Sequence, residues 1–113
     1  MKEFVKENNW LNEVNMGGWG NGYVAIPIGH PLHGKDYHII EELLPNLDVN
    51  GGITFSASAD ALKWDEIPTG YEGSWVVGFD TLHRWDTREM WSKEKVLEEA
   101  KNLKNQLLKY VDV

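Results

Sequence analysis

Two groups of ionisable and aromatic side chains each follow an apolar run of the sequence. The first group is His30, His33 and Tyr37, after the run 23–28. The second group is Asp80, His83, Arg84, Trp85 and Asp86, after the run 74–79. Imidazoles and carboxylates together can transfer protons, ligate metal ions or bind polar ligands. Because short apolar runs with β-branched and aromatic residues predict buried strands, we expect two strand exits to bring both groups into one binding site.

Metal ligation is one chemistry that these residues could support. A histidine of the first group, with the imidazole and carboxylates of the second, would offer ligands typical of zinc, iron or manganese sites. However, His30 and His33 flank Pro31 in a loop, so no helical spacing aligns them as a ligand pair. Histidines and aspartates that follow strands also commonly cap turns. We therefore assign no metal and no other cofactor, and keep a metal-dependent hydrolase as an alternative.

Acid/base catalysis is a second alternative. His83 lies three residues from both Asp80 and Asp86, so either carboxylate could orient the imidazole and stabilise its charged form. A hydrolase of this kind also needs a nucleophile, and Ser56 and Ser58 stand outside any GxSxG turn. The sequence leaves open whether the chain is an enzyme.

Aromatic residues favour a third interpretation, which is binding. The chain has six Trp and four Tyr, more aromatic surface than a small core usually needs. Trp75 is expected in the core, whereas Trp19, Trp64 and Trp85 stand among polar, charged or glycine residues. Because aromatic side chains are enriched in interfaces, these three tryptophans are the candidates for contact with a partner.

Composition narrows the classes of protein that the chain could represent. Its 113 residues are expected to form one domain, residues 1–113, and the absence of Cys excludes disulfides, thiolate metal sites and cysteine nucleophiles. No apolar run approaches the length of a membrane span or a signal-peptide core, so we expect a cytoplasmic protein without membrane contact. Eleven basic and eighteen acidic residues give a formal net charge of −7, which disfavours direct binding to nucleic acid. The oligomeric state stays open.

The elements that must position the two groups can be predicted from local pattern. Strands are expected near 22–28, 51–58 and 74–80, because these segments are apolar or alternate between apolar and polar residues. Residues 15–22 contain four Gly and two Asn, which favours a hairpin loop. Residues 1–12 are compatible with a short helix or an edge strand.

Two helices are also predicted. The first spans residues 36–44, with Asp36 as N-cap and Pro45 after its end, and an extended conformation is the alternative for this segment. The second begins after Ser92 and has an apolar face of Val96, Ala100, Leu103, Leu107 and Val111. The predicted fold is α+β, a mostly antiparallel sheet of three to five strands covered on one face by the C-terminal helix.

Three segments resemble a family of small proteins encoded by bacteriophages and prophages. The segments read GYVAIPIGHPLHGKDY, NGGITFS and WVVGFDTLHRWDTREMW, and the resemblance covers roughly residues 20–110. The shared pattern includes His30, Pro31, Gly34, Tyr37, Gly51, Gly52, Asp80, His83 and Asp86. Asn50 departs from it, because the family pattern has His at this position.

The resemblance implies a function in the cytoplasm of a host cell. We expect a non-enzymatic protein that binds a host macromolecule or a small polar ligand through the loops 29–38 and 80–91. Interference with host defence is one role that phage origin implies for such a protein. A metal-dependent or acid/base hydrolase remains the alternative.

Overall fold

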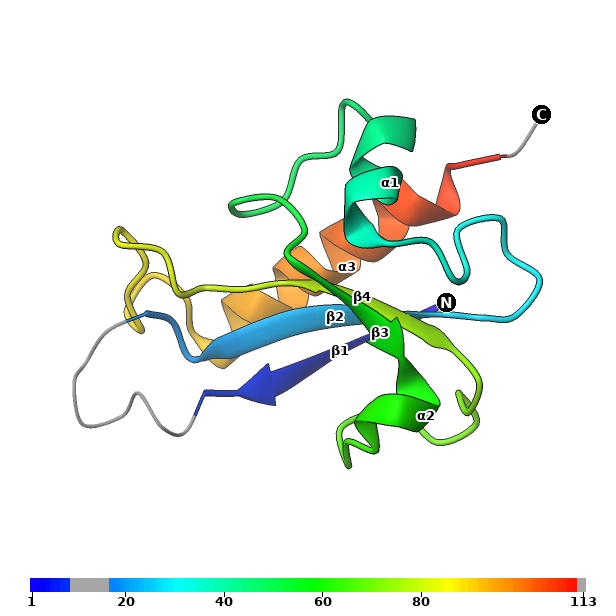
Figure 1. The fold of residues 1–113 in the computed structure, drawn as a ribbon. Helices are drawn as coiled ribbons and strands as arrows, with labels where there is room; N and C mark the ends of the chain where they lie inside the picture. The colour runs from blue at the N-terminus through cyan, green and yellow to red at the C-terminus, as the bar shows by residue number, and fades with distance from the viewer. Residues whose placement is uncertain (9–16, 112–113) are drawn as a thin grey trace.

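The structure, a computed structural model, describes residues 1–8 and 17–111 (Figure 1). The described elements are, in chain order, β1 (Lys2–Glu7), β2 (Gly20–Ile26), α1 (Tyr37–Leu43), β3 (Phe55–Ser58), α2 (Ala59–Leu62), β4 (Trp75–Phe79) and α3 (Lys93–Leu108). The predicted strands and helices are all present, with bounds that differ by a few residues. The segment 2–7, for which a helix was the other interpretation, is an edge strand.

The strands form an antiparallel sheet in the order β1-β2-β4-β3. β2 pairs with β1 on one side and with β4 on the other, and β3 pairs with the outer side of β4. Each of these pairings is antiparallel, and helices and strands are mixed along the chain. The predicted α+β fold is confirmed.

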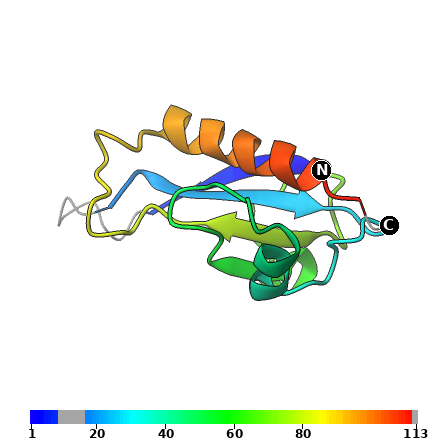
Figure 2. The same ribbon diagram turned by 90° about the horizontal axis from the view of Figure 1, so that it is seen from above.

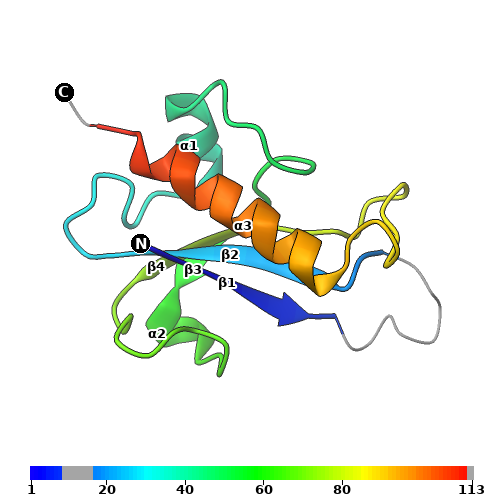
Figure 3. The same cartoon turned by 180° about the vertical axis from the view of Figure 1, so that it is seen from behind.

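The two faces of the sheet are covered differently. Side chains alternate along β2, so that Val24 and Ile26 face α3 and α1, whereas Tyr23 and Ala25 face α2 and the loop after it. Figure 3 shows α3 lying along one face of the sheet, with α1 beside its C-terminal end. Figure 2, seen from above, shows α3 along the β1 and β2 side of the sheet and α1 toward the β3 side.

The C-terminal helix follows the predicted apolar stripe with one exception. The Ser92 hydroxyl accepts a hydrogen bond from the Lys95 main-chain nitrogen at 3.3 Å, as an N-cap should. The stripe residues Val96, Ala100, Leu103 and Leu107 are all fully buried. Val111 was predicted to extend this stripe, but the helix ends at Leu108 and Val111 is 70% exposed. The prediction that Val111 belongs to the buried stripe is therefore wrong.

Part of the predicted hairpin loop is also wrong. Residues 9–16 lie outside the described residues, but Gly20 and Gly22 belong to β2. Close packing explains why glycine stands at both positions. A Cβ atom at Gly22 would overlap the ring of Phe79, and one at Gly20 would overlap the Lys6 carbonyl. The missing side chains let β2 approach its neighbours.

Within residues 1–8 and 17–111, no helix is both long enough and apolar enough to cross a bilayer.

Candidate functional site

The two predicted groups of site residues lie at opposite ends of the sheet. β2 and β4 run antiparallel, with Ile26 opposite Trp75 and Gly22 opposite Phe79. The chain therefore leaves β2 beside the start of β4 and leaves β4 at the far end. Figures 1 and 2 show the loop after β2, in cyan, and the loop after β4, in yellow, at opposite ends of the molecule. The prediction that both exits form one site is wrong, because only parallel neighbours end at the same edge.

The exit of β4 is organised around the carboxylate of Asp86, whose side chain is fully buried. The Oδ2 atom of Asp86 accepts a hydrogen bond from the His83 main-chain nitrogen at 3.0 Å and one from His83 Nδ1 at 2.7 Å. Asn50 Nδ2 lies 3.3 and 3.2 Å from the two oxygens of the same carboxylate. Asp86 thus joins two segments that are 36 residues apart. Buried carboxylates are stable only when donors of this kind satisfy them.

The imidazole of His83 is held on several sides. Nδ1 donates to Asp86 and lies 3.7 Å from Asp80 Oδ1. The ring stacks on the indole of Trp85, with centroids 5.0 Å apart and planes 8° from parallel. On the other nitrogen, Nε2, the ring lies against Gly51, where a Cβ atom would overlap it. The loop is therefore fixed at its base by contacts on both ring nitrogens.

Asp80 and Asn50 complete this base. The carboxylate of Asp80 accepts from the Leu82 main-chain nitrogen at 3.0 Å and from the Thr54 hydroxyl at 2.9 Å, so it caps the turn that follows β4. The main-chain nitrogen of Asn50 donates to Glu99 Oε2 of α3 at 3.0 Å. The resemblance singled out Asn50 only as a departure from the family pattern, and nothing in the sequence linked it to Asp86 or Glu99.

Beyond this base, the loop exposes large apolar side chains. Trp85 is 62% exposed, Met90 58% and Leu82 41%, and Arg84 is exposed beside them. Of the three tryptophans predicted for an interface, Trp85 alone is exposed. Trp19 packs against the core between the sheet and α3. Trp64 lies on the other face of the sheet, where its ring contacts those of Tyr23 and Phe55. We name Leu82, Trp85 and Met90 the loop patch.

The histidines at the exit of β2 bind main-chain groups instead. His33 Nε2 donates to the Gly73 carbonyl at 2.8 Å, and His30 Nδ1 accepts from the Leu32 main-chain nitrogen at 3.1 Å. Burial lowers the pKa of His30 below its usual value, and the positive charge of the N-terminal amine lowers it further. Tyr37, which begins α1, donates through its main-chain nitrogen to the Ser56 hydroxyl at 3.1 Å. The main-chain and ring contacts of this group stabilise the turn 27–35 and its junction with the sheet.

Among the residues that the structure describes, no three His, Cys, Asp or Glu side chains are grouped so that they could hold a metal ion. At the exit of β4, the carboxylate oxygens of Asp80 and Asp86 instead face amide, hydroxyl and imidazole donors.

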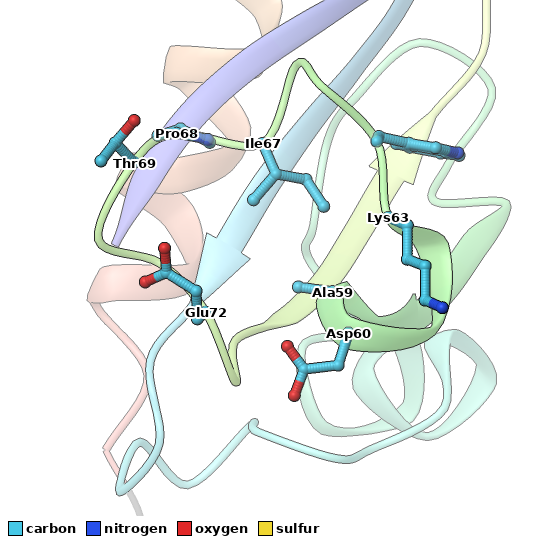
Figure 4. A pocket seen from close by; sticks show the side chains of 8 residues that line it. Ala59, Asp60, Lys63, Ile67, Pro68, Thr69 and Glu72 are labelled. Atoms are coloured by element: carbon cyan, nitrogen blue, oxygen red, sulfur yellow. The ribbon is translucent and has the colours of Figure 1, made fainter.

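A cavity of about 340 Å³ lies on the opposite face of the sheet from α3 (Figure 4). Its walls come from α2 and the loop after it, and its lining residues are Ala59, Asp60, Lys63, Trp64, Ile67, Pro68, Thr69 and Glu72. Asp60 and Glu72 place carboxylates at its rim, while Lys63 extends away from them. Of the residues nominated from sequence, Trp64 alone lines this cavity.

No protein-family model, no curated protein and no solved structure matches the chain.

Proposed function

We propose that this chain is a binding protein of phage or prophage type that attaches to a host protein through the loop 80–91. The observation that carries the proposal is the loop patch, in which three large apolar side chains are exposed on one short loop. Tryptophan, methionine and arginine are enriched in protein interfaces, and exposed apolar side chains that gather in one place are typical of binding surfaces.

The base of the loop supports this proposal because it limits the cost of binding. Asp86 is fully buried and accepts hydrogen bonds from His83 and Asn50, and the ring of Trp85 is stacked on that of His83. A side chain that is already positioned loses less conformational entropy when it enters a partner's pocket. Trp85 is therefore suited to be the anchor of an interface, and Leu82 and Met90 are further exposed apolar side chains on the same loop.

The charge of the chain favours a protein over a nucleic acid as the partner. A formal net charge of −7 repels a phosphate backbone. The opposite placement of the loops 29–38 and 80–91 also removes the shared pocket that a small polar ligand would have occupied. The resemblance to phage proteins adds the biological setting, which is inhibition of a host protein in the cytoplasm, including one that acts in defence.

A pull-down from bacterial lysate, followed by calorimetry with the purified partner, tests the proposal. We expect Trp85→Ala to lose a partner that the unchanged chain retains, with the melting temperature unaltered. Ile39→Ala is the matched control, because Ile39 is also exposed, at 43%, but lies on α1. Equal affinity of the purified partner for the unchanged chain and Trp85→Ala would overturn the proposal.

Acid/base hydrolysis is kept as a second candidate because of one distance. His83 Nδ1 lies 2.7 Å from the buried Asp86 carboxylate, which is how a catalytic imidazole is oriented in a hydrolase. However, Nε2, which would have to accept a proton, lies against Gly51. The binding proposal therefore expects p-nitrophenyl ester hydrolysis to proceed at the same rate with the unchanged chain and with His83→Gln. A rate that falls to background in His83→Gln would replace binding with catalysis.

A further inference from the structure

The chain contains two Asn-Gly dipeptides, and the fold places them in different environments. Asn21 and Gly22 lie in β2, which pairs with β1 on one side and β4 on the other, and Gly22 is buried. Asn50 and Gly51 lie in the turn 49–52, which a main-chain hydrogen bond of 2.9 Å closes, and Gly51 is exposed. Asn-Gly is chemically labile, because glycine has no Cβ atom to keep its nitrogen away from the asparagine side chain. The turn therefore presents a labile dipeptide to solvent.

The base of the loop 80–91 requires both members of this dipeptide. Asn50 Nδ2 donates to the buried carboxylate of Asp86, at 3.3 and 3.2 Å from its two oxygens. Gly51 has a φ angle of 71°, and a Cβ atom there would overlap His83 Nε2. A side chain at position 51 is thus excluded by the same packing that holds His83. The contacts that organise the base also create the labile pair.

Deamidation at this position would proceed in two steps. The Gly51 main-chain nitrogen attacks Cγ of Asn50, so that an N–Cγ bond forms and the Cγ–Nδ2 bond breaks. The amide proton of Gly51 leaves with Nδ2 as ammonia, and a five-membered succinimide remains. Water then opens either carbonyl of this ring and yields aspartate or isoaspartate. Among the described residues, the Gly51 nitrogen donates no hydrogen bond, so none has to be broken before the attack.

We propose that Asn50 is a site of spontaneous deamidation, which limits the lifetime of the base of the loop 80–91. Either product places a carboxylate where Nδ2 donated to Asp86, and two neighbouring carboxylates repel one another. A third acid is close, because Glu99 accepts from the Asn50 main-chain nitrogen at 3.0 Å. Isoaspartate also adds a carbon atom to the main chain before Gly51. The reaction separates the turn 49–52 from Asp86, whether or not the loop binds a partner.

Peptide mapping by mass spectrometry, after incubation of the folded chain in mildly alkaline buffer, tests this proposal. We expect the mass gain of replacing NH2 by OH to occur at Asn50 at least about tenfold faster than at Asn21, since Gly22 must first leave a central strand. In urea, where both dipeptides are unfolded, the two rates should become similar. Asn50→Gln should show no gain at position 50, because the longer side chain forms its cyclic imide far more slowly. Equal rates at Asn50 and Asn21 in the folded chain would overturn the proposal.

A second measurement tests the effect of the product on the base. Asn50→Asp reproduces one product, and we expect its melting temperature to be lower by roughly 10 °C. Asn46→Asp is the matched control, because Asn46 is exposed in a nearby turn and its replacement adds the same charge. This control should melt within a few degrees of the unchanged chain. Equal melting temperatures for the two variants would overturn the inference that deamidation disrupts the base.

Discussion

The two ends of the sheet both carry histidines, but different groups hold them. At the exit of β4, His83 donates to a buried carboxylate and stacks on an exposed tryptophan. At the exit of β2, His30 and His33 bind main-chain groups of their own turn and of the start of β4. The first arrangement gathers several donors on one buried carboxylate, whereas the second consists of separate hydrogen bonds, one within the turn and one to Gly73, 40 residues away. Residue type alone therefore does not tell which histidine organises a site.

Loss of the Asp86 carboxylate should have the largest effect. Asp86→Ala leaves the His83 and Asn50 donors without their acceptor in a buried environment. We expect the free energy of unfolding to fall by about 3 kcal/mol, measured by urea denaturation. Asp36→Ala is the matched change near the other exit. It removes an exposed N-cap, whose carboxylate accepts from the His38 nitrogen, and should cost about 1 kcal/mol. Equal losses would mean that the two ends are not organised differently.

A pair of glycine substitutions should sharpen the comparison. Gly51 and Gly70 both have positive φ angles, 71° and 92°, so alanine is strained at either position. At Gly51 the added methyl group also overlaps His83 Nε2, whereas at Gly70 it meets open space. We expect Gly51→Ala to lower the free energy of unfolding by about 2 kcal/mol more than Gly70→Ala does. Equal losses would show that His83 does not pack on Gly51.

Removal of the His33 side chain should have a smaller effect. His33→Ala deletes one hydrogen bond, between Nε2 and the Gly73 carbonyl, and leaves that carbonyl at the partly exposed end of the sheet. We expect a loss of about 1 kcal/mol in urea denaturation. A loss as large as that of Asp86→Ala would contradict the view that this end is held by separate bonds, each of which contributes little.

The smallest expected effect is the pH dependence that His30 contributes. Burial, and then the N-terminal charge, lowers the pKa of His30 below the ordinary value of 6.5. As the pH falls from 6.5 toward the lowered pKa, His30 of the unfolded chain binds a proton before His30 of the folded chain does, so the free energy of unfolding decreases. Above the ordinary pKa the contribution is constant.

Urea denaturation between neutral pH and about pH 5 measures this contribution. The unchanged chain should lose slightly more stability over this range than His30→Asn does. An NMR titration of the His30 ring should show a midpoint below the ordinary histidine value. A midpoint above that value would reverse the sign and contradict the assigned environment.

Local patterns in the sequence were sufficient to predict most of the elements. The spacing of Val96, Ala100, Leu103 and Leu107 fixes which face of α3 is buried, and Ser92 fixes where the helix begins. Asp36 and Pro45 likewise bound α1 to within one or two residues. These predictions succeeded because capping and amphipathic periodicity depend on residues within a few turns of one another. Val111 was assigned wrongly because a helix can end before its apolar pattern does.

The candidate site could be predicted only in part. Asp80, His83 and Asp86 are close in sequence and do form one network, and Trp85 is the exposed aromatic residue that the binding interpretation requires. The role of Asn50 could not be predicted, because its contact with Asp86 spans 36 residues. Trp19 and Trp64 were misassigned for a related reason, since polar sequence neighbours do not reveal what packs on a side chain in space.

The sequence by itself determined the class of the fold, the buried face of the long helix and the turn-forming chemistry at both strand exits. Those properties follow from the conformational preferences of short segments. An antiparallel sheet was predicted, but the tertiary structure alone decided that β2 and β4 are direct antiparallel neighbours, which places His30 and His83 at opposite ends of the sheet. Strand direction and pairing depend on the simultaneous burial of side chains from the whole chain, so no single segment encodes them.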